Sequence, residues 1–370
     1  MNHARLAERA GRVPAAVRWA GRALRAVEGR ADAAATACRA QTLSVLATVR
    51  QRAGRTSQAI ALCREAIAEA EPRADADAAL ASALAHACFI LDWALYDAGR
   101  VHEATHSARA LELYRRLGDA DRQAAVLNNL GGFAYHEGRW GDAVALYEQA
   151  AEASERAGDV ANAAFGACNV GEVLNDQGRL EEAEAKLRQA LRIWRGSQYD
   201  WGTAFVTAQL GRAAARAGRH DEALALLDDA HGAFERLHAH ADAALVEAYR
   251  AEALAFARLP ERALRVADRA LRDVGRTAPL LHRVRGLALA QRGDLVGAGH
   301  AFEASLREAD ARGSDYDVAV TLHALDALPG GGPPRVREVA RRLAQLGVVA
   351  LPAPPVSPAS RDRPLAAAPR

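Results

Sequence analysis

Residues 127–150 read LNNLGGFAYHEGRWGDAVALYEQA, and the spacing of small residues in this segment predicts the fold. Gly138 interrupts a helical pattern, and a second small residue, Gly131, lies seven positions before it. Ala143 and Ala150 follow it by five and twelve positions. A glycine at the interruption can adopt the left-handed conformation that ends a helix, so the chain can reverse there. The small residues on either side would then let two antiparallel helices cross closely.

The same spacing recurs along most of the chain. A turn residue followed five positions later by alanine occurs at Gly11/Ala16, Gly54/Ala59, Gly99/Ala104, Gly138/Ala143, Gly178/Ala183, Gly218/Ala223, Arg258/Ala263 and Gly293/Ala298. One helix pair cannot bury both of its faces alone, so neighbouring pairs must stack into an array. Arg258 replaces the usual glycine, although Pro260 still interrupts the helix there.

This pattern resembles the tetratricopeptide repeat. The residues that match its leucine–glycine, turn, alanine, bulky and alanine positions are Leu130-Gly131, Gly138, Ala143, Tyr147 and Ala150. A period near 40 is similar to the long-helix variant of kinesin light chains and of bacterial peptide-sensing regulators. The resemblance implies an all-α, right-handed superhelical solenoid of antiparallel helix pairs, with about seven to eight repeats over residues 1–328.

The two ends of the chain differ from the array. Residues 1–10 supply only the end of a first helix, so the first repeat is incomplete and we expect the chain to be the C-terminal part of a longer protein. Residues 329–334, PGGGPP, predict a linker. Residues 335–347 predict a short helix, and the Pro/Ala-rich residues 348–370 predict a disordered tail.

A narrower resemblance comes from the amino-acid sequence of four short segments. These segments are Leu91-Asp-Trp-Ala-Leu, Leu127-Asn-Asn-Leu-Gly, Gly138-Arg-Trp and Leu346-Gly-Val-Val. They resemble the C-terminal repeat arrays of bacterial regulators that carry an upstream nucleotide cyclase or a LuxR/MalT-like signal-transduction ATPase. The resemblance implies a sensor or regulatory region of a signalling or transcriptional regulator.

Composition narrows the class of protein. The net charge is +2 and the two signs are interleaved, which argues against a dedicated nucleic-acid surface. We find no run of 18 or more uncharged apolar residues and no signal-peptide core at the N-terminus, so we expect a cytoplasmic protein that does not engage a membrane. The sequence suggests no cofactor, and it leaves the oligomeric state open.

One motif could carry chemistry. His102-Glu103-Ala104-Thr105-His106 matches the H-E-x-x-H zinc-protease signature, whose two histidines share a helix face. Ala104 is also the alanine of the repeat, and acidic residues recur at the position of Glu103 in other repeats. The repeat therefore accounts for the motif, and a zinc-dependent hydrolase is only a remote alternative. His231, His238 and His240 have no standard metal-site spacing. We predict no catalytic residue, no metal site and no enzyme.

Asparagines form the stronger candidate site. Five of the six lie between Asn128 and Asn175, although asparagine is a poor helix residue. Asn128, Asn129 and Asn169 fall in the middle of first helices, and Asn175 follows one turn later. An amide both donates and accepts, which suits the backbone of an extended peptide. Alternatively, these amides hydrogen-bond to neighbouring helices.

Further residues project onto the same expected groove: Trp93, Tyr96, Tyr135, Glu172, Asp176, Arg212 and Arg216. They could equally form an ordinary solvated face. Together with the asparagines they predict an interaction scaffold that binds a protein or peptide in its concave groove. A sensor of a small molecule or of a short signalling peptide is the alternative.

Overall fold

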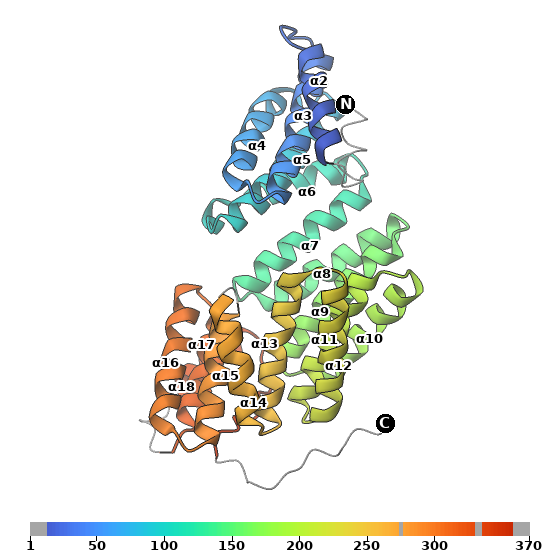
Figure 1. Cartoon of the computed structure of the whole chain (residues 1–370). Helices are drawn as coiled ribbons and strands as arrows, with labels where there is room; N and C mark the ends of the chain where they lie inside the picture. Colours follow the sequence, from blue (N-terminus) through green and yellow to red (C-terminus); the bar gives the residue numbers. More distant parts are fainter. Residues whose placement is uncertain (1–12, 274–276, 330–334, 358–370) are drawn as a thin grey trace. The chain divides into compact units, whose positions relative to one another are not determined.

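The computed structural model describes residues 13–273, 277–329 and 335–357. Over these ranges the chain forms seventeen α-helices, α2 to α18, three short 3-10 helices and no strand (Figure 1). The predicted all-α fold class, with helices packed as sequential pairs, is confirmed. The expected turn at Gly11, most of the 329–334 linker and residues 358–370 lie outside the described residues.

Two compact units make up the chain. Unit 1 contains Met1–Leu130 and Glu152–Asp159, and unit 2 contains Gly131–Ala151 and Val160–Arg370. Helices α7 (Ala120–His136) and α8 (Trp140–Arg156) each contribute residues to both units.

Unit 1 is built from pairs of helices packed around alanine-rich contacts. Its helices are α2 (Val13–Ala26), α3 (Ala33–Arg52), α4 (Thr56–Ala70), α5 (Ala78–Asp97) and α6 (Ser107–Arg116), with 3-10 turns η1 (Glu71–Arg73) and η2 (Val101–Glu103). Helix α3 packs on α4, and α5 packs on α3, α4 and α6. Ile60, Cys63 and Leu91 lie in a core shared by α3, α4 and α5.

Helix α5 is the single described helix that is long and apolar enough to cross a membrane, with a mean hydropathy of 1.6. The sequence analysis found no such candidate. Two thirds of the helix is buried against its neighbours, and it carries the buried Asp92. A core helix of this kind passes the same length and composition test, so the finding is weak support for a membrane span.

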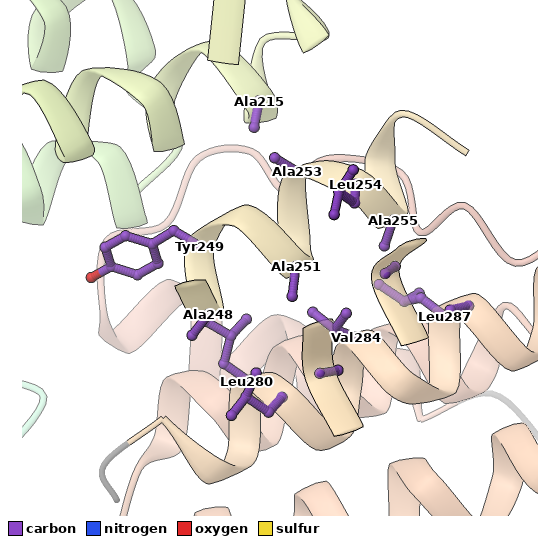
Figure 2. Packing of buried hydrophobic residues seen from close by; sticks show 14 of the residues in the cluster. Ala215, Ala248, Tyr249, Ala251, Ala253, Leu254, Ala255, Leu280, Val284 and Leu287 are labelled. Carbon is purple, nitrogen blue, oxygen red and sulfur yellow. The ribbon is translucent and has the colours of Figure 1, made fainter. Parts of the chain in front are cut away.

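Unit 2 continues the same arrangement. Its further helices are α9 (Val160–Asp176), α10 (Leu180–Gly196), α11 (Asp200–Arg216), α12 (His220–Arg236), α13 (His240–Phe256), α14 (Pro260–Ala270), η3 (Leu271–Asp273), α15 (Ala278–Gln291), α16 (Leu295–Ala311), α17 (Asp315–Asp326) and α18 (Val336–Gln345). From α9 to α15, each first helix packs on the second helix of its pair and on the first helix of the next pair. Figure 2 shows this second kind of contact, with Ala251 and Leu254 of α13 near Val284 and Leu287 of α15.

Left-handed residues set the length of every helix in the middle of the chain. All six glycines at the predicted turns from Gly54 to Gly293 have φ between 68° and 84°. A second set, between repeats, was not predicted: Gly118, Gly158, Gln198, His238 and Gly313. From Gly118 to Arg258 a left-handed residue therefore occurs every 20 positions, and the helices between them are 17 residues long. Gln198 and His238 hid this regularity because they are not glycines, whereas the spacing from Arg258 to Ala263 predicts the turn there.

The small residue seven positions before the turn lies where the paired helices cross. A Cβ atom on Gly171 would lie 2.7 Å from Leu187 Cγ, and one on Gly211 would lie 2.8 Å from Leu227 Cγ. In the next repeat the corresponding residues are Ala251 and Ala267, both fully buried. Where alanine replaces glycine on the first helix, alanine also replaces leucine on the second helix, so the two helices can still approach closely.

The chain after α18 packs against unit 2. Leu346 is buried with Trp140, Val170 and Ala183, and Val356 joins the core cluster that contains α13 and α15. Residues 348–356 form no helix, turn or strand. This described part of the expected tail therefore differs from a disordered segment, because two apolar anchors and backbone hydrogen bonds hold it. The composition suggested disorder since prolines and small residues dominate it.

We predict opposite effects for two helical glycines. Gly211→Ala should lower the free energy of unfolding by about 1–3 kcal/mol, because the new methyl group meets Leu227 and the Ala223 carbonyl. Gly299→Ala, on α16, should raise it by roughly 0.5–1 kcal/mol, because nothing lies within 4 Å and alanine favours the helix. Urea denaturation of the full chain measures both. Equal effects would show that the crossing at Gly211 is not tightly packed.

Candidate functional site

Three consecutive first helices of unit 2 carry polar residues on one face. The residues at positions i, i+3 and i+7 of each helix are Asn169, Glu172 and Asp176 on α9; Gln209, Arg212 and Arg216 on α11; and Tyr249, Glu252 and Phe256 on α13. This spacing places the three residues of each helix on one side, and the 40-residue repeat aligns the three helices. We call the eight polar residues of this set, together with the neighbouring Tyr135 and Asn175, the polar face.

Asp176 is the centre of the polar face. Its carboxylate accepts a hydrogen bond of 2.5 Å from the Tyr135 hydroxyl, and it pairs with Arg212 at 2.7 Å and Arg216 at 2.9 Å. Arg216 also donates to the Asn175 carbonyl at 2.8 Å. The side chains of Asp176, Arg212 and Arg216 are 1%, 8% and 5% exposed, so these are buried charges. Two guanidinium groups share one carboxylate here.

The surroundings keep Asp176 ionised. Burial by itself would raise the pKa of this carboxyl, but the charges of Arg212 and Arg216 and the Tyr135 hydrogen bond outweigh it. The pKa of Asp176 therefore lies below its ordinary value. Burial, with the nearby Asp176 charge, raises the pKa of Tyr135 well above its ordinary value, so the phenol stays protonated and donates.

Amide groups link the first two helices. Gln209 Nε2 donates to Glu172 Oε1 at 3.1 Å, and Asn175 Nδ2 donates to the Gln209 carbonyl at 3.3 Å. The alternative was that these amides hydrogen-bond to a neighbouring helix, and the Asn175 Nδ2 group does so. On the far side, the Arg212 guanidinium lies over the Tyr249 ring, 4.8 Å from its centroid.

Four buried polar atoms of this cluster have no hydrogen-bond partner among the described residues. They are Asn175 Oδ1, Gln209 Oε1, Arg212 Nε and Glu252 Oε2. Arg212 Nε and Glu252 Oε2 face each other as an ion pair at 3.9 Å, beyond hydrogen-bonding distance. Buried polar atoms are normally paired, so a water or another polar group that enters the cluster would pair these four atoms.

Helix α17 covers part of the cluster. Its Tyr316 ring lies 5.2 Å from the Trp140 ring, centroid to centroid. Burial raises the pKa of Tyr316 to about 12, and the charges of Arg216, Asp176 and Arg212 also act on it. Tyr316 therefore lies beside the ionic centre rather than in solvent.

The structure brings together six of the eleven predicted groove residues: Tyr135, Glu172, Asn175, Asp176, Arg212 and Arg216. Asp176, Asn175 and Arg212 are buried, so an ordinary solvated face does not describe them. Asn169 is half-buried on α9. Trp93 and Tyr96 on α5, and Asn128 and Asn129 on α7, are half-buried residues of unit 1.

Four residues of the cluster were missed by the sequence analysis: Gln209, Tyr249, Glu252 and Tyr316. Three of them could have been found from the repeat spacing. Gln209 lies 40 positions after Asn169, and Tyr249 and Glu252 lie 80 positions after Asn169 and Glu172. Tyr316 could not be found in this way, because it lies on α17 and is not a whole number of 40-residue repeats from Asn169, Glu172 or Asp176.

The H-E-x-x-H motif does not have the geometry that it requires. His102 and Glu103 lie in η2, while His106 precedes α6, so the two histidines are not on one α-helix. His106 Nδ1 is 2.9 Å from Asp92, and Glu103 pairs with Arg100 at 2.6 Å. Asp92 also accepts from the backbone amides of His106 and Ser107, so it caps α6.

The second histidine group is likewise dispersed. His231 Nε2 lies 3.5 Å from Glu247, while His240 Nδ1 lies 3.9 Å from Glu235. In the part of the chain that the structure describes, three or more histidine, cysteine, aspartate or glutamate side chains nowhere gather as a metal site would require.

Comparisons with known proteins agree with this architecture. Residues 122–196, which span α7 to α10, match the tetratricopeptide repeat family model. No curated protein sequence matches the chain significantly.

Solved structures share the fold over longer stretches. A Rap protein complexed with competence and sporulation factor is 15% identical with a TM-score of 0.65, covering 93% of this chain and 97% of that one. The Rap conjugation gene regulator of the plasmid pLS20, in complex with the Phr* peptide, is 15% identical with a TM-score of 0.52, covering 82% and 84%. BtubC (BKLC) from P. vanneervenii is 23% identical with a TM-score of 0.50, covering 60% and 91%. The likeness shows a tetratricopeptide-type repeat fold.

Removing the central charge should destabilise unit 2 strongly. Asp176→Asn leaves Arg212 and Arg216 buried without a counter-charge, and loss of one partner from a buried ion pair costs about 3–5 kcal/mol. Glu182→Gln, which breaks the exposed Glu182–Arg179 pair, is the control and should change little. Thermal denaturation compares them. Equal melting temperatures would show that Asp176 does not hold the cluster together.

The difference in melting temperature between the unchanged chain and Asp176→Asn should depend on pH. The pKa of Asp176 is lowered in the folded chain, so its contribution to stability is complete above the unfolded value of about 4 and is lost as pH falls through the folded value. The gap in melting temperature between the unchanged chain and Asp176→Asn should thus be constant from pH 7 to pH 5. It should shrink below about pH 4. A gap that is independent of pH down to pH 3 contradicts an ionised Asp176.

Proposed function

We propose that this tetratricopeptide-type array is a polypeptide-binding scaffold, and that its polar face in unit 2 contacts the backbone of the partner. The unpaired polar atoms support this assignment most directly. These atoms are buried, so a peptide reaches them only when the side chains that cover them move aside. Asn175 Oδ1 and Gln209 Oε1 would then accept from peptide N–H groups, and Arg212 Nε would donate to a peptide carbonyl. An extended peptide offers both kinds of group along its length.

Electrostatics favour a backbone ligand over a highly charged one. The charged residues of the cluster are Glu172, Asp176, Arg212, Arg216 and Glu252, which leaves one net negative charge. Most of that charge is already paired within the cluster. A strongly anionic ligand such as a nucleic acid would meet three carboxylates here, so a polypeptide is the better match.

Other repeat proteins of this fold give the proposal a precedent. One Rap protein is complexed with competence and sporulation factor, and another Rap regulator is complexed with the Phr* peptide. We propose by analogy that this chain is the sensor or regulatory region of a cytoplasmic bacterial signalling or transcriptional regulator. A short signalling peptide is one form that the polypeptide partner can take.

The amide oxygens provide the test. Asn175→Ala together with Gln209→Ala should weaken partner binding about 5- to 150-fold per bond, because each lost bond that leaves a buried ligand group unpaired costs roughly 1–3 kcal/mol. A partner captured from the native cell, or a synthetic peptide derived from it, gives the affinity by calorimetry. The fold should persist, since alanine is a better helix former than either amide.

Gln123→Ala is the matched control for this test. Gln123 Nε2 also donates to a backbone carbonyl, that of Tyr114 at 3.1 Å, but it lies in unit 1 outside the polar face. The control should keep full affinity. Unchanged affinity in the double variant, with a large loss of thermal stability, would mean that the two amides only hold the helices together.

A further inference from the structure

The segment after α18 runs along one edge of unit 2, where the first and second helices of each pair are joined. Leu346 Cδ2 would lie 3.1 Å from a Cβ atom placed on the turn glycine Gly138. At the next turn, Val349 donates its backbone N–H to the Gln177 carbonyl at 2.8 Å. Gln177 Nε2 in turn donates to the Leu346 carbonyl at 3.0 Å. We call residues 346–357 the strap and this row of turns the turn edge.

The strap reaches two repeats further along the same edge. Arg258 Nη1 donates to the Ser357 carbonyl at 3.0 Å, and Pro355 and Val356 are buried beside it. The first helices of neighbouring pairs pack roughly 10 Å apart, so two repeats span about 20 Å. Eight residues cover about 12 Å as a helix and up to about 26 Å when extended. The strap from Ala350 to Ser357 must therefore be extended.

Two departures from the repeat pattern coincide with the strap. Arg258 occupies a turn position where the other predicted turns of the described chain carry glycine, and its φ is 58°. A non-glycine residue pays a conformational penalty in this region, which is tolerated where the surroundings give a reason. Gln177 takes the place held by Glu137, Ala217 and Ala257 in neighbouring repeats. Both unusual residues bond to the backbone of the strap.

The contacts define a recognition chemistry. The turn edge bonds to main-chain groups at Leu346, Val349 and Ser357, so it does not need particular side chains there. Residues 347–357, GVVALPAPPVS, contain no charged side chain. Apolar side chains anchor the two ends, at Leu346 and Val356. An extended, uncharged, proline-containing segment meets all these conditions.

We propose that the turn edge of unit 2 is a second binding surface, separate from the polar face, for an extended uncharged proline-containing segment. The strap occupies this surface in cis and masks it. A polypeptide partner of the same chemistry binds at the turn edge only when the strap leaves. The edge is thus a masked docking site, and the strap is its built-in competitor.

A labelled peptide with the strap sequence, LGVVALPAPPVS, tests this directly on the full chain. In the chain carrying Val349→Pro and Val356→Asp, the strap loses one backbone donor and its buried anchor. This strap-released chain should bind the peptide at least tenfold more tightly than the unchanged chain, as measured by fluorescence anisotropy. Equal affinity of the two chains, or equal binding of a scrambled peptide, overturns the proposal.

Two turn glycines supply a matched pair on the strap-released chain. A methyl group on Gly178 would overlap the Ala350 carbonyl, so Gly178→Ala should abolish peptide binding. Gly218→Ala introduces alanine at nearly the same backbone conformation, φ 79° against 77°, with nothing within 4 Å. It should leave binding intact. If both substitutions weaken binding equally, the effect comes from the turn backbone and the edge is not the binding surface.

Arg258→Gly keeps the proposal testable if the released chain folds poorly. It restores the glycine of the other turns and removes the bond to Ser357. Hydrogen exchange should become at least fivefold faster in a peptide covering residues 346–357, which includes the bonded Val349 amide, while α13 and α14 keep their protection. Unchanged exchange in the strap would show that Arg258 does not hold it, and would contradict the proposal. Since the polar-face variants leave the turn edge intact, failure of the proposed function is distinguishable from failure here.

Discussion

From α7 to α13 the chain reverses after every 17 helical residues, and this constraint sets how the helices of these repeats pack. A left-handed residue at each reversal makes the next helix run antiparallel to the previous one. The constant spacing of 20 residues keeps equivalent residues of successive repeats in register. Register then decides packing: Gly171 meets Leu187 and Gly211 meets Leu227 because each pair is 16 positions apart. The same register aligns polar residues of α9, α11 and α13 on one face. Stability and site therefore come from one periodicity.

Burial of the charged residues of the polar face costs free energy, and neighbouring side chains offset this cost. Isolated charges are costly inside a protein, and Asp176 is stabilised only because two arginines and a phenol surround it. These partners come from two other first helices: Tyr135 from α7, and both arginines from α11. The cluster consequently links neighbouring repeats through charge as well as through apolar contact. A ligand that pairs the remaining polar atoms would act on a part of unit 2 where several helices meet.

The repeat could be predicted from the sequence because small residues and turn glycines are needed at fixed steric positions. The turns between the two helices of each pair were predicted correctly from these glycines. The turns at Gln198 and His238 did not, because side chains other than glycine hide a left-handed backbone. For the site, the 40-residue spacing was sufficient to reach Asp176 and Arg212, but not the contact of Tyr316 with Trp140. That contact depends on how far the helix pairs of unit 2 rotate, which no local pattern encodes.

The two surfaces of unit 2 differ in chemistry, and the difference follows from where they lie in the repeat. The polar face uses side chains in the body of first helices, where an Asn, Gln or Arg can be added without disturbing the helix crossing. The turn edge uses residues at reversals, where backbone carbonyls at helix ends remain without helical partners. The Gln177 carbonyl is such a group, and Val349 supplies its hydrogen bond. Helix ends in every repeat present equivalent carbonyls, so an extended segment can follow the edge from one pair to the next. Gln177 and Arg258 then determine where along the edge the strap is held, because their side chains donate to its carbonyls at Leu346 and Ser357.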